Sequence, residues 1–404
     1  MVHRIRELDG HVRSRTNRLV DAPVIPLRRS ICYVASYDPD YSRNVDVVRA
    51  FQAAGVRVEW PKPRSSDAQL RSSETGFISN GLRVLAGAIP RSIDVALRLL
   101  RCRALVVGYF GQLDMLLLAP ISRLLQRPVI FNPLVTLGDT IIEDRGLVAA
   151  GTPVASLIEY LDRWSLRLAD IVIVDTPENR EYIVRRANLS PGKVIVLPVG
   201  VDESIFFPGK SNGGNDSGAL DVLFYGKFIP LHGVETILRA AGILESTHPG
   251  LRVELIGTGQ QYGAARRLAD DLALGNVDWT DWLPYSELGE RLRAADVALG
   301  VFDGGGKAAR VIPNKVHQAL ACGIPVVTGD SPAVRRMLAH RESAMLVPPD
   351  DPDALASAIG ELADDVVLRH RIGKAGREAW ERTASGERLT EIAGEILDRA
   401  GARR

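Results

Sequence analysis

Short apolar runs alternate with longer amphipathic segments along most of this chain, beginning at Ser30. Short runs rich in Val, Ile and Leu predict buried strands of a parallel sheet, and apolar residues at i, i+3, i+4 and i+7 predict helices that cover such a sheet. In the first half of the chain, helices are expected at 44–54, 112–126, 154–169 and 178–187. Strands are expected between them at 31–36, 56–60, 104–107, 128–131, 171–175 and 194–197.

The alternation starts again after 207–219, a segment whose Gly, Ser and Asn residues predict a flexible loop. A helix with one apolar face is expected at 234–244. Further strands are expected at 221–225, 252–256, 277–279, 296–301, 325–328 and 344–347. The pattern predicts an α/β fold of two doubly wound, Rossmann-like domains that meet near residue 204 and face a central ligand cleft at the carboxyl ends of their strands.

The composition places the chain among soluble globular proteins. Its 404 residues are 46% hydrophobic and 25% charged, which excludes a disordered or fibrous chain. No uncharged apolar run reaches about 18 residues, so no membrane span is expected, and the first thirty residues lack the apolar stretch of a secretory signal. The three widely spaced cysteines exclude a disulfide framework and predict a reducing cytoplasm.

The charge is unevenly distributed. The net charge of +1 is too small to indicate a nucleic-acid partner. Residues 1–205 carry 27 basic and 22 acidic residues, whereas 206–404 carry 23 and 27. Residues 1–29 alone contain seven arginines and three acids without an apolar period, which predicts a mobile basic arm. Either the basic half faces an anionic surface, or the imbalance is a chance property of a solvated surface.

The segment 221–241 is the first candidate site, because a buried strand runs into a glycine, a basic turn and a helix. Gly226 lets the backbone approach a ligand, the start of the helix offers free N–H groups, and Lys227 and His232 add charge suited to phosphate. The alternative is an ordinary strand-to-helix loop. Gly257 and Gly259 follow the next strand and also permit a close backbone approach, although glycine is the default turn residue there.

The strongest candidate is the segment 300–330, where three glycines including Gly305 follow a strand. Pro313 and Asn314 are expected to start a helix whose N–H groups point into the cleft. Three cations flank that start and suit a diphosphate: Lys307, Arg310 and Lys315. Gln318, one turn beyond Lys315, is placed to bond sugar or ribose hydroxyls, while His317 is expected to be a partly exposed helix residue.

Two segments of the first domain are also expected at the cleft. In "SYDPDYSRN", Ser42 and Arg43 precede a helix and are expected to face the cleft, although this is equally an ordinary turn. In "FNPLVTLGDTIIEDRG", carboxylates after Gly138, among them Asp139, are placed to bind acceptor hydroxyls or the donor sugar. The alternative for this second segment is an exposed helix with capping acids.

Several classes of site are not supported. The seven histidines show no HExxH spacing, and none lies between Val12 and Leu231, so a histidine-bound metal in the first domain is excluded. No serine-hydrolase elbow and no P-loop occur. We therefore expect a diphosphate site without a metal or another cofactor.

These motifs, in this order, resemble a known family. "YGKFIPLHG", "LIGTGQ", "WTDWLPYSELGERLRAADVALGVF", "IPNKVHQALACGIPVVTGDSPAV" and "ESAMLVPPDDPDALASAI" resemble the carboxyl-terminal domain of family 4 glycosyltransferases with the GT-B fold. The resemblance is good over 194–379 and is weaker in the first half of the chain. It implies an acceptor-binding domain at 30–203, a nucleotide-sugar-binding domain at 204–379, and a carboxyl-terminal helix in 380–404 that returns to the first domain.

The resemblance also implies roles for individual residues. Lys227 and His232 stand at the family's basic pair for the diphosphate, with histidine where lysine is usual. Leu283 stands in the loop whose backbone contacts the nucleotide base, and Trp282 beside it is expected to be core. The family's two glutamates, eight positions apart, are replaced here by Arg310 and Gln318. A first-domain histidine and a glycine pair are also missing, and Asp139 and Arg43 are the candidates to take their place.

The function implied is transfer of a sugar from a nucleotide-diphospho-sugar to a glycan or lipid-linked acceptor, with retention of configuration and without an essential metal. Lys227, Arg310, Lys315 and the helix dipole would then assist the leaving group. The alternatives are an epimerase or phosphorylase of the same fold, or a catalytically silent nucleotide-sugar-binding scaffold. Arginines at 83, 91, 98, 101 and 103 lie among apolar residues, so a peripheral contact with the inner face of the membrane and an ordinary solvated face are both open.

Overall fold

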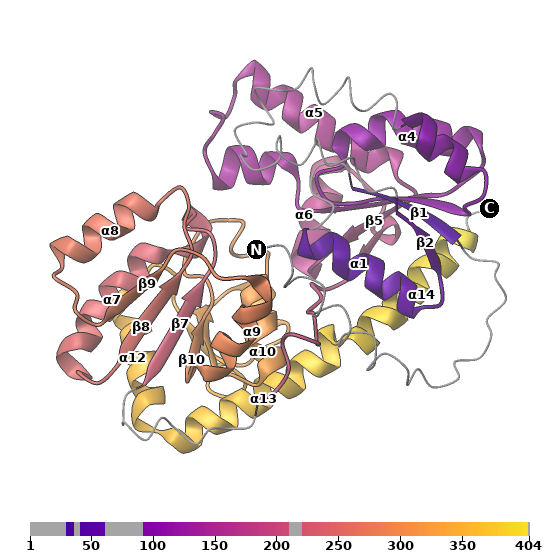
Figure 1. Cartoon of the computed structure of the whole chain (residues 1–404). Helices are drawn as coiled ribbons and strands as arrows, with labels where there is room; N and C mark the ends of the chain where they lie inside the picture. Colours follow the sequence, from indigo (N-terminus) through magenta and orange to yellow (C-terminus); the bar gives the residue numbers. More distant parts are fainter. Residues whose placement is uncertain (1–29, 36–40, 61–91, 210–219, 403–404) are drawn as a thin grey trace, which may run out of the picture.

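The computed structural model describes residues 30–35, 41–60, 92–209 and 220–402. Over these ranges the chain forms two α/β lobes, each built on a parallel six-stranded sheet (Figure 1). The prediction of two doubly wound domains is confirmed, and all twelve strands begin within one residue of their predicted starts. The predicted basic arm at 1–29 and most of the predicted loop at 207–219 lie outside the described residues.

The first sheet has the order β2-β1-β3-β4-β5-β6. Its strands are β1 (Ser30–Val34), β2 (Arg57–Glu59), β3 (Ala104–Val107), β4 (Val129–Leu134), β5 (Ile171–Val174) and β6 (Val194–Val196). One face packs on α1 (Ser42–Ala53) and α14 (Gly386–Ala402). The other face is covered by the helical residues 92–99 and by α4 (Gln112–Leu124), α5 (Pro153–Leu168) and α6 (Pro177–Ala187). Because both faces are covered, the strands are buried runs without alternation.

The second sheet has the order β12-β11-β10-β7-β8-β9. Its strands are β7 (Asp221–Tyr225), β8 (Arg252–Ile256), β9 (Val277–Thr280), β10 (Val297–Leu299), β11 (Val326–Gly329) and β12 (Met345–Val347). One face packs on α7 (Val234–Thr247), α8 (Tyr262–Asp271) and α12 (Pro352–Asp364). The other packs on α9 (Tyr285–Ala294), α10 (Asn314–Cys322), α11 (Pro332–Arg335) and α13 (Val366–Ala384).

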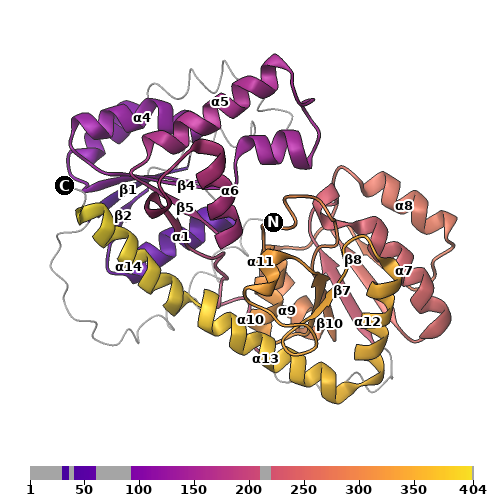
Figure 2. The same cartoon turned by 180° about the vertical axis from the view of Figure 1, so that it is seen from behind.

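The end of the chain connects the lobes. Helix α13 ends at Ala384, the backbone of Ser385 is extended, and α14 begins at Gly386. Both views show α13 and α14 running from the second lobe to the first (Figures 1 and 2). Leu389, Ile392 and Ile396 of α14 are buried in the core of the first domain. The chain thus crosses between the lobes twice, once after β6 and once at Ser385.

The lobes also contact each other directly through an apolar cluster. Leu134, Val135 and Val199 of the first domain are buried together with second-domain residues, namely Ile229, Leu231, Ala308 and Val311. All of these lie just after the carboxyl ends of strands. The carboxyl edges of the two sheets therefore face each other, as the doubly wound pattern predicts for a ligand site. None of the described helices is long and apolar enough to span a bilayer.

Candidate active site

The loop after β7 has a backbone that requires glycine at two places. Gly226 has a φ of 144°, and a Cβ there would lie 3.1 Å from both His232 Cε1 and Lys315 Nζ. Gly233 has a φ of 62° and begins α7 without a side-chain cap. The amino terminus of α7 therefore keeps N–H groups that no side chain caps, next to a surface that only glycine leaves open.

Gly257 and Gly259 serve a different purpose from the one expected. A Cβ on Gly257 would lie 2.0 Å from Gly226 O, and one on Gly259 would lie 2.6 Å from Phe228 N. The two loops are also joined by hydrogen bonds from Gly226 N to Ile256 O and from Phe228 N to the carbonyl of residue 258, both at 2.9 Å. These glycines permit the β7 and β8 loops to pack together, so the space beside them is filled by protein backbone.

Lys315 is the most unusual side chain of the site. It lies at the first turn of α10, it is 6% exposed, and its Nζ has no hydrogen-bond partner. The ammonium lies 3.8 Å from the centroid of the Phe224 ring, which offers a cation–π contact and no acceptor. Burial lowers the pKa of Lys315 well below its ordinary value. A buried amine without an acceptor costs folding free energy, and a bound anion would remove that cost.

His232 lies beside Lys315, where the positive charges of other side chains act on it. Its ring is 9% exposed and its Nδ1 has no partner. Burial, followed by the charge of Lys315, lowers the pKa of His232 well below its ordinary value, and Lys307 and Arg145 act in the same direction. His232 is thus neutral at pH 7. Lys315 and His232 both lie beside Gly226, and the charge of Lys307 also acts on His232, while the side chain of Lys227 is exposed on the loop. Their common contact with a diphosphate stays a prediction.

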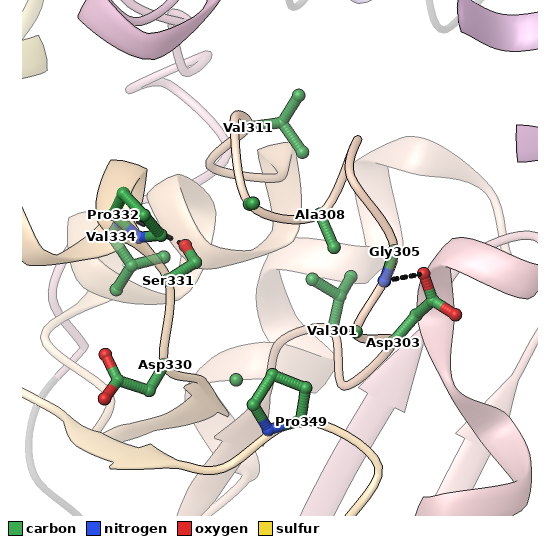
Figure 3. Close-up of a pocket in the computed structure, with 13 residues that line it drawn as sticks. Val301, Asp303, Gly305, Ala308, Val311, Asp330, Ser331, Pro332, Val334 and Pro349 are labelled. Carbon is green, nitrogen blue, oxygen red and sulfur yellow. Dashed lines mark hydrogen bonds between the residues drawn. The ribbon is translucent and has the colours of Figure 1, made fainter. Parts of the chain in front are cut away.

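The loop after β10 lies above a cavity of about 160 Å³ (Figure 3). Gly304 N donates to Asp350 Oδ2 at 3.0 Å, and Gly305 N donates to Asp303 Oδ2 at 2.9 Å, so the glycine run is an ordered turn. The cavity is enclosed by this loop and by the residues that follow β11 and β12, including Ser331 and Pro349. All of its lining residues belong to the second domain, and neither Arg310 nor Lys315 is among them. The cavity therefore lies beside the predicted cations and does not contain them.

Arg310 and Lys307 reach across to the first domain. The Arg310 guanidinium forms an ion pair with Asp139, while Lys307 Nζ lies 2.8 Å from Asp144 Oδ2. Asp139 and Asp144 are 1% and 3% exposed, so both pairs are largely removed from water. Burial raises the pKa of Asp139 to about 6, against the opposing effect of Arg310. Of the three predicted diphosphate cations, Lys315 alone is left without an acidic partner.

The acids that face these cations lie on a π-helix, η3 (Asp139–Asp144). Asp162 of α5 fixes the turn before it, because its carboxylate accepts hydrogen bonds from Leu137 N at 3.0 Å and Gly138 N at 2.8 Å. Asp139 N donates to the hydroxyl of Thr136 at 3.1 Å. Single π-helical turns occur frequently at functional sites. The sequence contains a signal for Asp162, which is an acid at i+4 from Ile158 on the buried face of a predicted helix.

Two polar contacts close the interface beside these pairs. Asn314 Nδ2 donates to Ser42 Oγ at 2.9 Å, and the Thr176 hydroxyl donates to the carbonyl oxygen of Arg310 at 2.5 Å. Ser42 is thus at the cleft, as predicted, and Thr176 was not predicted. Helix α10 has no side-chain N-cap, whereas α6 and α11 are capped by Thr176 and Ser331. No side chain therefore caps the first N–H groups of α10, which begins at the interface beside Lys315.

Comparison with known proteins shows which proteins this chain resembles. Residues 219–365 match the model of "Glycosyl transferases group 1". Among solved structures, sucrose-phosphate synthase from Thermosynechococcus elongatus superposes with a TM-score of 0.70 at 20% identity, over 93% of this chain and 100% of that one. HepE from Anabaena, solved in complex with UDP, gives 0.68 at 14% identity, over 92% and 99%.

Curated relatives agree with that match. The D-inositol 3-phosphate glycosyltransferase of Acidothermus cellulolyticus is 30% identical over 244 residues, which cover 54% of this chain and 52% of the relative. A GDP-mannose-dependent monoacylated alpha-(1-6)-phosphatidylinositol monomannoside mannosyltransferase from Corynebacterium glutamicum is 30% identical over 210 residues, or 48% and 55%. The chain spans about half the length of the curated relatives it matches.

The second domain of this chain is similar to the group 1 glycosyl transferases.

The fold of the chain is GT-B, as the resemblance implied, because the likeness to the solved structures extends over both lobes. Gln318 stands where the resembling family has one of its glutamates, and its amide is held inside the protein. Gln318 Oε1 accepts from the Tyr225 hydroxyl at 2.8 Å, and its Nε2 donates to the Tyr285 hydroxyl at 3.1 Å. The side chain of Leu283 packs against the core beside it. Their contacts with a ribose and a base stay predictions.

One residue of the predicted site was assigned wrongly. Arg43 is buried, and its guanidinium donates hydrogen bonds within the first domain rather than into the cleft. Its guanidinium donates to Leu197 O at 2.8 Å, to Pro198 O at 2.6 Å and to Asn132 Oδ1 at 3.2 Å. Arg43 thereby holds the end of β6 against α1, and its donors are committed to the protein. Its role is structural support of the first domain.

Two neighbouring expectations are also wrong. Trp282 is 73% exposed and therefore not core. His317 is 2% exposed rather than partly exposed, and every residue of α10 from Lys315 to Cys322 is buried. Amphipathic spacing cannot identify a helix that is buried on all sides.

The buried His317 gives a pH prediction. Burial, followed by the charge of Arg43, lowers the pKa of His317 to about 3, so the folded protein holds it neutral. In the unfolded chain its pKa is about 6.5. Below pH 6.5 the unfolded state binds a proton that the folded state does not, and stability falls. When the pH falls from 7 to 5, the free energy of unfolding should decrease in wild type by about 2 kcal/mol more than in His317→Gln, which has no histidine to protonate at this position. Urea unfolding at both pH values measures this, and equal losses would contradict it.

Among the described residues, no group of three or more His, Cys, Asp and Glu side chains is arranged to hold a metal ion. The charges that the structure gathers at the interface are instead organic cations and acids. The positive groups are Lys307, Arg310 and Lys315, and the negative groups are on η3. The role of these cations in binding a diphosphate stays a prediction.

Proposed function

We propose that this protein transfers a sugar from a nucleotide-diphospho-sugar to a glycan or lipid-linked acceptor, with retention of configuration and without a metal. The second domain would bind the donor and the first domain would bind the acceptor. The observation that carries the proposal is the buried, unpartnered Nζ of Lys315 at the start of α10. Its position beside Gly226 and His232 supports a bound diphosphate.

The chemistry follows from the leaving group. When the bond between the anomeric carbon and the diphosphate breaks, negative charge develops on the phosphate oxygen that leaves. Lys315, Lys227 and the uncapped amino termini of α7 and α10 supply positive charge and N–H donors for that oxygen. The apolar contacts around Leu134 and Leu231 exclude water between the lobes. Donor hydrolysis is thereby disfavoured against transfer to an acceptor hydroxyl.

The acids of η3 would then act on the acceptor side. Arg310 and Lys307 pair with Asp139 and Asp144 in this structure. A donor diphosphate that attracts Arg310 would release Asp139. Burial raises the pKa of Asp139 to about 6 while Arg310 is beside it, and departure of Arg310 would raise this pKa further, so the carboxyl group would exchange protons near neutral pH beside an acceptor hydroxyl. Asp139 and Arg310 are therefore the proposed catalytic residues, together with Lys227.

The test measures release of nucleoside diphosphate from a panel of UDP-, GDP- and dTDP-sugars. A bacterial membrane extract serves as the source of acceptor. Release that depends on both donor and acceptor supports the proposal, and analysis of the product's anomeric configuration tests retention. Binding of a sugar nucleotide without turnover on any acceptor fraction would instead favour a silent binding protein. Interconversion of the sugar without transfer would indicate an epimerase.

Lys227→Ala tests the contribution of the exposed loop cation. If its amine contacts the diphosphate, loss of one charge-assisted hydrogen bond should weaken donor binding or slow transfer by roughly one to three kcal/mol. Steady-state kinetics with the best donor of the panel measures the change. Lys374→Ala is the matched control, because Lys374 is exposed on α13. Kinetics of Lys227→Ala that equal those of the control would refute the role.

A further inference from the structure

The outer face of α5 is apolar although it is exposed. Val154, Leu157, Tyr160 and Trp164 are 48%, 57%, 55% and 41% exposed. They follow one another at intervals of three or four residues, so they form one stripe along the helix. The opposite side of α5, which includes Ile158 and Leu166, is buried in the first domain. Helix α5 therefore has apolar side chains on both its inner and its outer face.

Other elements on the same side of the first lobe carry further exposed apolar residues. Ile93, Leu97 and Leu100 are 62%, 61% and 58% exposed, and Leu124 at the end of α4 is 84% exposed. Residues 92–99, α4 and α5 cover the same face of the first sheet, where they share one core. Arg123 Nη2 donates to Leu168 O at 2.8 Å, which joins the end of α4 to the end of α5. We call this set of exposed apolar residues the α5 face.

The charges on the α5 face are positive. The exposed basic residues of these elements are Arg101, Arg103, Arg123, Arg163 and Arg167. The acids are buried or paired. Asp114 and Asp162 are 7% and 6% exposed, Glu159 lies 2.8 Å from Arg186, and Asp94 lies 2.9 Å from Arg98. Exposed Leu, Tyr and Trp side chains with arginines and no unpaired acid are typical of a helix that lies at a lipid interface.

We infer that the α5 face docks on an anionic lipid bilayer. The apolar stripe would enter the boundary between headgroups and acyl chains, while the arginines contact lipid phosphates. Charge complementarity favours this occupant over a second copy of the chain, because a symmetric contact would bring two sets of arginines together. Of the arginines expected to contact a membrane, Arg98 is paired with Asp94, and those at 83 and 91 lie outside the described residues.

The α5 face is directly connected to the candidate active site. Ile158 on the inner side of α5 packs against Leu137, which precedes η3, and against Ile141, which lies within η3. Asp162 of the same helix fixes the turn before η3. A bilayer beneath α5 would therefore lie next to the acids that face the second domain. The inference extends the proposed function to acceptors carried on lipids, but docking itself does not require sugar transfer.

The test is flotation of the full chain with lipid vesicles, compared between phosphatidylcholine alone and phosphatidylcholine with phosphatidylglycerol. Wild type should float with the anionic vesicles. The double variant Leu157→Ser/Trp164→Ser should lower the bound fraction at least tenfold at equal lipid. Val366→Ser/Val367→Ser is the matched control, because these exposed apolar residues lie on α13 of the second domain. The control should bind as wild type does, and circular dichroism checks that both variants are folded.

Three results would overturn the inference. Wild type that does not float with anionic vesicles excludes docking. A Leu157→Ser/Trp164→Ser variant that binds as wild type does assigns binding to another part of the chain. A wild-type dimer in sedimentation velocity that the same variant converts to a monomer, without an effect on flotation, identifies the α5 face as a contact between copies. Sugar transfer is not measured in these assays, so their failure leaves the proposed function standing.

Discussion

Lys315→Met should weaken binding of a nucleoside diphosphate and at the same time stabilise the unliganded protein. The buried ammonium has no acceptor in the unliganded protein, and its desolvation is a cost that methionine does not carry. Loss of a hydrogen bond from a charged group should weaken binding by roughly 1.5 to 3 kcal/mol, or about 10- to 150-fold. The free energy of unfolding should rise by about 1 kcal/mol or more. Calorimetric titration with UDP and GDP and urea unfolding measure the two changes.

The opposite signs make this prediction specific. A residue that only supports the fold would lose stability and binding together when replaced. Lys374→Met is the control for removing a lysine charge from the surface, and it should change neither quantity. A Lys315→Met protein that binds nucleotide as wild type does would remove Lys315 from the site. One that is less stable would show that the amine has an internal partner.

Replacing either member of the Arg310–Asp139 pair should have large and different consequences. Arg310→Met leaves the Asp139 carboxylate buried without its cation, and breaking one side of a buried pair costs about 3 to 5 kcal/mol. The interface around η3 should open, and transfer should slow by about 10²- to 10³-fold because a cation for the leaving group is also lost. Small-angle scattering should show a larger radius of gyration, and initial rates measure the loss.

Asp139→Asn separates binding from transfer. It frees Arg310 from its acidic partner, so a nucleoside diphosphate no longer competes with a carboxylate, and binding should tighten by about 5- to 30-fold, or roughly 1 to 2 kcal/mol. Transfer should nevertheless slow, since the proposed acceptor contact is lost. Glu178→Gln is the control, because its pair with Arg336 joins the lobes at an exposed place, 2.9 Å apart. Weaker nucleotide binding in Asp139→Asn would contradict the competition.

The fold could be predicted from the sequence because its signals are local. Buried parallel strands such as Ala104–Val107 and Asp221–Tyr225 are continuous apolar runs, and the structure places them at the predicted residues. Helix α7 shows its buried face in the spacing of Val234, Ile237, Leu238 and Leu244. Motif spacing also indicated the β7 and β10 loops. The structure places Lys307, Lys315 and His232 near one another at the ends of these strands.

The remaining features depend on contacts between distant segments. Arg43 follows a turn at the edge of the sheet where a ligand was expected. Its side chain is instead oriented by hydrogen bonds to Leu197 O and Pro198 O, more than 150 residues away in the sequence. His317 is buried where the charge of Arg43, in the other domain, acts on it. The partner of Arg310 was expected to be a ligand, and in this structure it is Asp139 of the other lobe. The spacing of apolar and polar residues near an arginine does not indicate its partner, because the same local sequence can place the side chain in either environment.

The most direct test of the central claim is a crystal structure with bound UDP or GDP, whichever binds more tightly. We expect a diphosphate oxygen about 3 Å from Lys315 Nζ, with further oxygens at the first N–H groups of α10 and beside Gly226. Arg310 should then have turned from Asp139 toward the phosphates. A nucleotide bound elsewhere, with Lys315 Nζ still against the Phe224 ring and without an acceptor, would contradict the account.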